Sequence, residues 1–328
     1  RPERSSKRPD TAIGEDFVSN ALHPAPLSRR TFLGALAGSA LRASTQPSSK
    51  PLRGIFPIVA TPFTASKALD WDDLAKEVEW FDRCGAHGIV WPQRASEYDT
   101  LSFDERRRGF EVIAQASRGK RPAVVFGIQG PDAKAALQYL DHAEKHSPDA
   151  FIAIPPDKAA ALEDFRAYYR ALAKATRRPI FIQTTGGGSS LKMPVSLVVE
   201  LAREHPNLGY VKEELEPLVE RMKQLCAARP PLTCVMSGSA GKAMLPEMAA
   251  GSDGTMPGAS YTDVYVQVWA AWQAGDRRQA REIFTRLLPL INLDGLAAQG
   301  YQYAMYRRGV FKTPASRHQR PRLTPELA

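Results

Sequence analysis

One stretch, Leu208-Gly-Tyr-Val-Lys-Glu-Glu214, places a lysine near the end of an apolar, β-type run. In a buried strand Lys212 would lie inside the protein, where desolvation disfavours a charged amine. Such a lysine is either paired with an acid or used as a nucleophile, because a neutral amine attacks a ketone to form a Schiff base. The alternative is that Lys212 lies just past the strand and extends into solvent beside Glu213 and Glu214.

Similar apolar runs alternate with amphipathic helical stretches on both sides of this segment, from Gly54 onward. The other predicted strands are 55–60, 88–91, 123–127, 150–154, 179–183, 232–236 and 254–258. Two of the predicted helices have clear start signals, namely Asp70 as an N-cap and a capping box of Ser102 with Glu105. Eight strand–helix units predict a (β/α)8 barrel, whose active site lies at the carboxyl ends of the strands.

An open, doubly wound sheet is the competing architecture. It would need a glycine-rich loop after the first strand, and Ala60-Thr-Pro-Phe63 is not one. One further helix is expected over 279–291, and the end of the chain, 313–328, is expected to be extended. We therefore divide the chain into a leader and linker (1–50), the barrel (51–293) and a short C-terminal helical extension (294–328).

The leader contains Ser28-Arg-Arg-Thr-Phe-Leu-Gly34, followed by a short run rich in Ala and Gly. A twin arginine before such a run resembles a twin-arginine export signal, here 28–43. The run is too short to span a membrane as a stable helix. The segment predicts export to the periplasm; the alternative is a chance Arg-Arg pair in a cytoplasmic protein.

Composition narrows the possible functions. The formal net charge is +9, but residues 1–50 hold eight Lys or Arg and four Asp or Glu, so +4 lies in the leader. No basic run is interleaved with aromatic residues, and nucleic-acid binding is not expected. Cys84, Cys226 and Cys234 show no metal-ligand spacing and are expected to be small buried residues, although Cys226 and Cys234 could pair under oxidising conditions. We see no ligand spacing among the histidines either and assign no metal.

Several motifs together resemble the dihydrodipicolinate synthase/N-acetylneuraminate lyase family of class I aldolases. They are the first-strand run 54–63, the segment 96–106, Tyr210-Val-Lys-Glu213, Met236-Ser-Gly238 and Gly251-Ser-Asp-Gly254. Other stretches, such as 154–156 and 288–292, are most similar to the branch that dehydrates 2-keto-3-deoxy sugar acids. The resemblance implies a Schiff base between Lys212 and a 2-oxo acid, no metal or organic cofactor, and a homo-oligomer.

Two departures from the family pattern concern the site. Asp157 stands where the family usually has a proton-relay tyrosine, and Arg94 and Ala95 stand where it commonly has two threonines that hold the substrate carboxylate. Tyr98 and Tyr261 are candidate replacement phenols, although packing is the simpler explanation for each, because aromatic residues commonly line the rim of a barrel. The loop 186–190 is either an anion cradle or a plain loop.

The catalytic assignment is thus Lys212 and Asp157. Substrate contacts are assigned to Arg94, Ala95, Ser96, Thr185, Met256 and Gly258. For Arg94 we expect a charged, bidentate grip on a carboxylate; the alternative is that it turns outward to Glu97 or Asp99. The predicted function is a Schiff-base lyase, aldolase or dehydratase, acting on a small 2-oxo acid or 2-keto-3-deoxy sugar acid. The alternative is a catalytically impaired, exported binding protein for such an acid.

Overall fold

The computed structural model describes residues 50–185, 188, 190–296 and 300–318. The chain divides into two units, Arg1–Ser44 and Thr45–Ala328, and all the described residues belong to the second. The predicted export signal at 28–43 therefore lies outside the described residues. Within the described part of the chain, no helix has the length and apolar character needed to cross a membrane.

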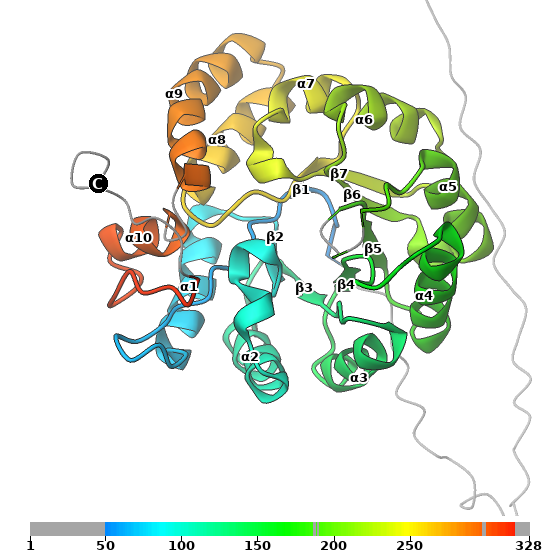
Figure 1. Cartoon of the computed structure of the whole chain (residues 1–328). Helices are drawn as coiled ribbons and strands as arrows, with labels where there is room; N and C mark the ends of the chain where they lie inside the picture. Colours follow the sequence, from blue (N-terminus) through cyan, green and yellow to red (C-terminus); the bar gives the residue numbers. More distant parts are fainter. Residues whose placement is uncertain (1–49, 186–187, 189, 297–299, 319–328) are drawn as a thin grey trace, which may run out of the picture. The chain divides into compact units, whose positions relative to one another are not determined.

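Eight parallel strands form the centre of the second unit (Figure 1). They are β1 (Gly54–Ile55), β2 (Gly88–Trp91), β3 (Ala123–Gly127), β4 (Ala150–Ala153), β5 (Ile180–Gln183), β6 (Tyr210–Glu213), β7 (Cys234–Ser237) and β8 (Gly254–Thr255). The strands pair in chain order from β2 to β8, and β8 pairs with β1. Beyond β1, Ile58 bridges both Val90 and Gly258, so the sheet closes on itself. The predicted (β/α)8 barrel is confirmed.

Helices surround this barrel, as Figure 1 shows. They are α1 (Trp71–Cys84), α2 (Phe103–Ala116), α3 (Ala133–Glu144), α4 (Leu162–Ala175), α5 (Val195–Glu204), α6 (Leu218–Ala227), α7 (Met244–Ala249), α8 (Thr262–Gln273), α9 (Arg277–Leu296) and α10 (Gly300–Arg307). Short 3-10 turns complete the described elements: η1 (Arg94–Ser96), η2 (Tyr98–Thr100), η3 (Pro206–Leu208) and η4 (Ser239–Gly241).

The helix start signals are confirmed. The Asp70 side chain accepts a hydrogen bond from the Asp73 backbone N–H at 3.1 Å and so satisfies one of the free donors of α1. Ser102 and Glu105 form the reciprocal capping box at the start of α2.

Several boundaries differ from the sequence prediction. β1 ends at Ile55 rather than at residue 60, and β8 ends at Thr255, because Pro57 and Pro257 lack the N–H that a strand ladder needs. The expected last helix is longer: α9 runs from Arg277 to Leu296. The helix α10 was not predicted individually, and it contacts α9 and lies beside α1 at the left of Figure 1.

The C-terminal segment is tied to the loop after β2 by Glu97, which is 3% exposed. One carboxylate oxygen accepts from Gln302 Nε2 at 2.8 Å, and the other accepts from the backbone N–H groups of Arg317 at 2.9 Å and His318 at 3.1 Å. Charge-assisted hydrogen bonds of this kind are strong when water is excluded. Glu97 therefore holds α10 and the following segment against the barrel.

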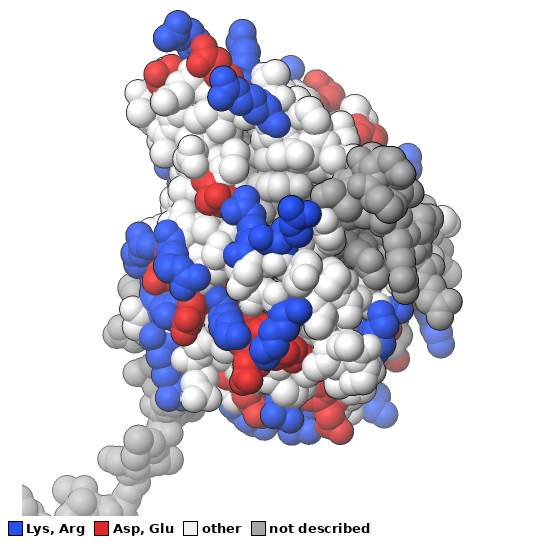
Figure 2. Space-filling view, turned by 90° about the vertical axis from the view of Figure 1, so that its left-hand side faces the viewer, with Lys and Arg blue, Asp and Glu red and all other residues white. Residues whose placement is uncertain are grey.

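The sequence predicts no basic patch for binding nucleic acid, and the distribution of surface charges can be compared with this expectation. Figure 2 shows basic and acidic side chains interspersed on the face that carries α1, α2 and α10.

Cys84, Cys226 and Cys234 are free thiols, and Cys234 is buried. The possible Cys226–Cys234 disulfide does not form in this structure.

Candidate active site

Strand alternation decides which way Lys212 points. In β6, Val211 packs in the cluster between the strands and the helices, whereas Tyr210 packs against the cluster that fills the barrel interior. Because successive side chains on a strand face opposite sides, Lys212 lies on the same side as Tyr210, inside the barrel. It is 4% exposed and sits in register with Gln183 on β5 and Met236 on β7. The alternative of a solvent-extended lysine is therefore wrong.

The ammonium group of Lys212 has two polar contacts at the carboxyl end of the barrel. Its Nζ lies 3.2 Å from Glu214 Oε1 and donates to Gln183 Oε1 at 3.3 Å. A buried cation is costly unless it is paired and hydrogen-bonded, and here it is both. A buried lysine was expected either to pair with an acid or to act as a nucleophile, and the structure shows the pair with Glu214.

Glu214 is itself held by several donors. Its Oε2 accepts from Gln183 Nε2 at 2.9 Å and from Thr185 Oγ1 at 2.8 Å, and its Oε1 accepts from the Ser239 N–H at 3.0 Å. Burial raises the pKa of the Glu214 carboxyl, but the charge of Lys212 and these hydrogen bonds lower it by more. The resulting pKa lies below its ordinary value, so the carboxylate form of Glu214 is favoured.

Gly238 gives the Glu214 side chain its space. A Cβ atom at residue 238 would lie 2.3 Å from both Cγ and Oε1 of Glu214. Side-chain atoms do not approach one another this closely, so any larger residue would displace the carboxylate. The glycine of the Met236-Ser-Gly238 motif thus positions Glu214.

The loop that carries Glu214 is anchored by its neighbour Glu213, which is fully buried on the helix side of β6. One oxygen of Glu213 accepts from Thr184 Oγ1 and from the Leu215 N–H, each at 2.7 Å. The other oxygen pairs with Arg221 of α6 at 2.9 Å. These contacts fix the backbone directly after Lys212.

Buried polar contacts also support the strand ends next to the lysine. Tyr169 of α4 is fully buried, and its hydroxyl lies 2.9 Å from the carbonyl of Ala153 and 3.3 Å from that of Gln183. The hydroxyl thereby links the ends of β4 and β5. Gln183, which contacts Lys212, is held at both its backbone and its side chain.

Asp157 and Arg94 lie at the rim, where both are exposed. Asp157 Oδ1 accepts from the backbone N–H of Gly188 at 2.9 Å, which joins the loops after β4 and β5. Burial, and then the negative charge of Asp157, raise the pKa of Tyr98, whereas the charge of Arg94 acts in the opposite direction. Tyr98, Arg94 and Asp157 are therefore electrostatic neighbours above the barrel. Of the candidate loop 186–190, residues 186, 187 and 189 lie outside the described part.

The acids proposed as alternative partners of Arg94 have other partners in the structure. Glu97 binds the C-terminal segment, as described above, and Asp99 lies 3.0 Å from His318. Tyr261, the other candidate phenol, is half-buried, and its ring centroid lies 5.9 Å from Cζ of the Arg308 guanidinium.

The remaining predicted contacts fall into two groups. In the first group, Thr185 contacts the site through its hydrogen bond to Glu214. Met256 belongs to the cluster that fills the barrel interior, and Ala95 packs against this cluster. Ser96, by contrast, is fully buried: its hydroxyl donates to the Val59 carbonyl at 2.6 Å and accepts from the Gln93 N–H at 3.0 Å. Ser96 therefore holds the loop.

Gly258 belongs with Ser96 in a supporting role. A Cβ at residue 258 would lie 2.0 Å from the Tyr301 ring, so the glycine permits α10 to pack on the barrel.

Sequence reasoning missed Gln183, Glu214 and Gly238. Glu214 had a signal, because it stands two residues after Lys212 and period-2 alternation brings it back to the same side. Gln183 had none, since only the register between β5 and β6 places it beside the lysine.

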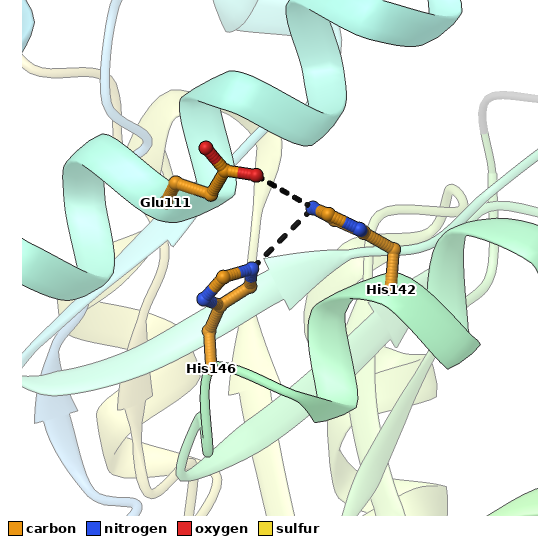
Figure 3. A group of neighbouring side chains, drawn as sticks. All are labelled: Glu111, His142 and His146. Atoms are coloured by element: carbon orange, nitrogen blue, oxygen red, sulfur yellow. Dashed lines mark hydrogen bonds and ion pairs between the residues drawn. The ribbon is translucent and has the colours of Figure 1, made fainter.

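Two of the histidines do show a metal-ligand spacing, contrary to the prediction from the sequence. His142 and His146 are four residues apart at the end of α3, which is a metal-ligand spacing, and Glu111 of α2 lies beside them (Figure 3).

A closed parallel barrel with a buried lysine near the carboxyl end of its sixth strand defines the class I aldolase type of (β/α)8 protein. The comparison with known families then identifies the group. A family model described as the dihydrodipicolinate synthetase family matches residues 51–324, and the chain belongs to this family.

Relatives of known name agree with this assignment. The chain is 32% identical over 162 residues to a 4-hydroxy-tetrahydrodipicolinate synthase of Rhizobium meliloti, a match that covers 49% of this chain and 55% of that protein. It is 27% identical over 243 residues to a synthase of the same name from Methanopyrus kandleri, covering 73% of this chain and 80% of that protein. These relatives support a Schiff-base aldolase or lyase acting on a small substrate.

Solved structures share the fold. A putative dihydrodipicolinate synthetase from Pseudomonas aeruginosa superposes with a TM-score of 0.78 at 23% identity, covering 84% of this chain and 96% of that one. YagE, a prophage protein of this family from E. coli K12 solved in complex with pyruvate, also gives 0.78, at 20% identity, covering 84% and 94%.

Proposed function

We propose that this protein is a Schiff-base-forming lyase that acts on a small 2-oxo acid through Lys212. The observation that carries the proposal is the buried Lys212–Glu214 pair at the carboxyl end of β6, with Gln183 beside it. A family relationship to synthases and the likeness to a pyruvate-bound protein support the same substrate class.

The pair suggests how the amine becomes reactive. When a substrate enters, Glu214 takes a proton from the Lys212 ammonium, and the neutral amine attacks the keto carbon to form a carbinolamine. Loss of the positive charge removes one of the main causes that hold the Glu214 pKa low. Glu214 then returns the proton to the carbinolamine hydroxyl, which leaves as water, and a protonated imine remains.

The protonated imine withdraws electrons from the neighbouring carbons. This favours cleavage of a C–C bond, as in an aldolase, or loss of a hydroxyl, as in a dehydratase. The stretches that are similar to the 2-keto-3-deoxy sugar acid dehydratases favour the second reaction, with Arg94 holding the substrate carboxylate and Asp157 near its hydroxyls. Glu214 would then take over the proton transfers of the missing tyrosine.

The test is borohydride trapping with a panel of 2-oxo acids, read by intact mass. A mass increase with pyruvate or a sugar-derived 2-oxo acid should appear in the native protein and vanish in Lys212→Ala. Lys242→Ala is the matched control, because Lys242 follows β7 at the same end of the barrel and is exposed. Equal adducts in native protein and Lys212→Ala would refute the assignment.

A second candidate function is a binding protein that holds a 2-oxo acid without turning it over. The exposed aspartate at the relay position and the resting ion pair of Lys212 favour it. Saturable binding of a 2-oxo acid, with no borohydride adduct and no product, would decide for this candidate.

We also propose periplasmic export and a homo-oligomer. The export proposal rests on Arg29 and Arg30 in the segment 28–43. Replacement of both by lysine should leave unprocessed protein in the cytoplasm, and a mature form outside the inner membrane would contradict it. The oligomer proposal rests on the family, in which one similar structure is described as the first monomeric variant. Light scattering at several concentrations tests it, and a constant monomer mass would contradict it.

A further inference from the structure

A group of metal-ligand side chains lies far from Lys212 in the barrel. Glu111 projects from α2, His142 from the last turn of α3, and His146 from the turn between α3 and β4 (Figure 3). His146 precedes β4, so the group belongs to the amino ends of the strands, whereas Lys212 lies near a carboxyl end. A surface groove of about 570 Å³ opens beside it, lined by Glu111 and His146 among others.

The separations match those of ligands around one ion. His142 Nε2 lies 3.3 Å from Glu111 Oε1 and 3.3 Å from His146 Nε2. All three ligand atoms lie within 4.8 Å of one another. A tetrahedral ion with ligands at 2.0–2.1 Å spaces their atoms about 3.3–3.4 Å apart. Two of the three edges therefore have the tetrahedral length already, and the third needs at most a small side-chain movement.

Packing holds the central imidazole in place. The His142 side chain is 11% exposed, and its ring lies 6.4 Å from that of Phe110 and 5.0 Å from that of His146. Glu111 and His146 are more exposed, so an ion can enter from the groove. Two ligands come from the end of α3 and the third from α2, so an ion bound to all three would link the two helices.

Arg107 opposes metal binding in the resting state. Its Nε donates to His142 Nδ1 at 3.2 Å, which requires the proton of the neutral ring to lie on Nε2. An ion bound at Nε2 needs the other tautomer, with the proton on Nδ1. Binding therefore moves this proton within the ring and releases Arg107, whose NH1 lies 3.6 Å from Asp104 on the outer surface.

We propose that Glu111, His142 and His146 form a binding site for a divalent transition metal, with Zn²⁺, Ni²⁺ and Cu²⁺ as the fitting ions, that joins α2 to the end of α3. Two imidazoles and one carboxylate suit these borderline ions better than Mg²⁺ or Ca²⁺, which prefer all-oxygen sites. Water completes the coordination. The site is structural, because its residues lie away from Lys212 and strengthen the contact between two barrel helices.

Metal-free protein without a histidine tag provides the test, by calorimetric titration with ZnCl₂ and by thermal unfolding with and without the metal. We expect one equivalent of Zn²⁺ per chain, a higher Tm with Zn²⁺, and no comparable effect of Mg²⁺. His146→Gln should weaken Zn²⁺ binding at least tenfold, and so should Glu111→Gln, whose exposed side chain leaves the packing intact. His205→Gln, outside the group, is the matched control and should bind like the native protein.

Arg107→Gln supplies a readout that a purely packing role would not produce. Loss of the competing donor and its charge should tighten Zn²⁺ binding several-fold. Borohydride trapping at Lys212 should be equal in all four variants, so failure of this site and failure of the proposed lyase function are separate results. Equal Zn²⁺ affinity in native protein, His146→Gln and Glu111→Gln would overturn the proposal, as would no binding below about 1 mM.

Discussion

The buried carboxyl of Glu247 should make the stability of this protein depend on pH in an unusual direction. Glu247 lies on α7, is 1% exposed, and its Oε1 has no hydrogen-bond partner among the described residues. Burial raises its pKa from 4.5 to about 7, and three nearby carboxylates add to the effect, those of Glu213, Glu214 and Glu216. Between pH 4.5 and about 7, the Glu247 carboxyl is therefore protonated in the folded protein and ionised in the unfolded chain.

The sign and size of the effect follow from this difference. Between pH 4.5 and about 7 the folded state binds the extra proton, so the free energy of unfolding falls as the pH rises through this window. One pKa unit corresponds to about 1.4 kcal/mol, which makes the total roughly 3 kcal/mol. Glu247→Gln, which cannot ionise, should be close to native stability at pH 4.5 and more stable by roughly this amount at pH 8.

Urea unfolding of both proteins from pH 4.5 to 8.5 measures the difference directly. The control is Glu282→Gln on α9, because that carboxylate is 62% exposed and changes its surroundings little on unfolding. Its difference from native protein should stay flat across the range. A flat difference for Glu247→Gln as well would refute the reasoning and show that Glu247 is ionised in the folded protein.

Three further predictions concern the site. Glu214→Gln keeps the shape but removes the proton acceptor, so the rate of borohydride trapping should fall by about 10²-fold or more while the protein stays folded; an unchanged rate would assign the proton transfers elsewhere. Gly238→Ala should displace Glu214 and slow trapping similarly, at a cost of about 1–3 kcal/mol in unfolding free energy; normal trapping would show that the loop yields. Arg94→Ala should weaken 2-oxo acid binding roughly tenfold to a hundredfold, since a charge-assisted hydrogen bond contributes about 1.5–3 kcal/mol, and Arg94→Lys should weaken it less. Equal affinities for native protein and Arg94→Ala, measured by calorimetry, would exclude the anchoring role.

Much of this protein was determined by local chemistry that the sequence displays. Asp70 and the Ser102–Glu105 pair begin their helices because a side chain within three residues satisfies the free N–H groups. Alternation along 208–214 directs Lys212 into the barrel, because a strand repeats every two residues.

The tertiary structure decided the partners. The register of β5 against β6 sets Gln183 beside Lys212, and Gly238, directly after β7, leaves space for Glu214. Glu111 and His146 stand thirty-five residues apart in the sequence and meet only because α2 packs beside α3. Such contacts depend on how elements distant in the chain pack together. A local sequence pattern sets the period of one helix or strand and does not specify which residues of another element it will contact.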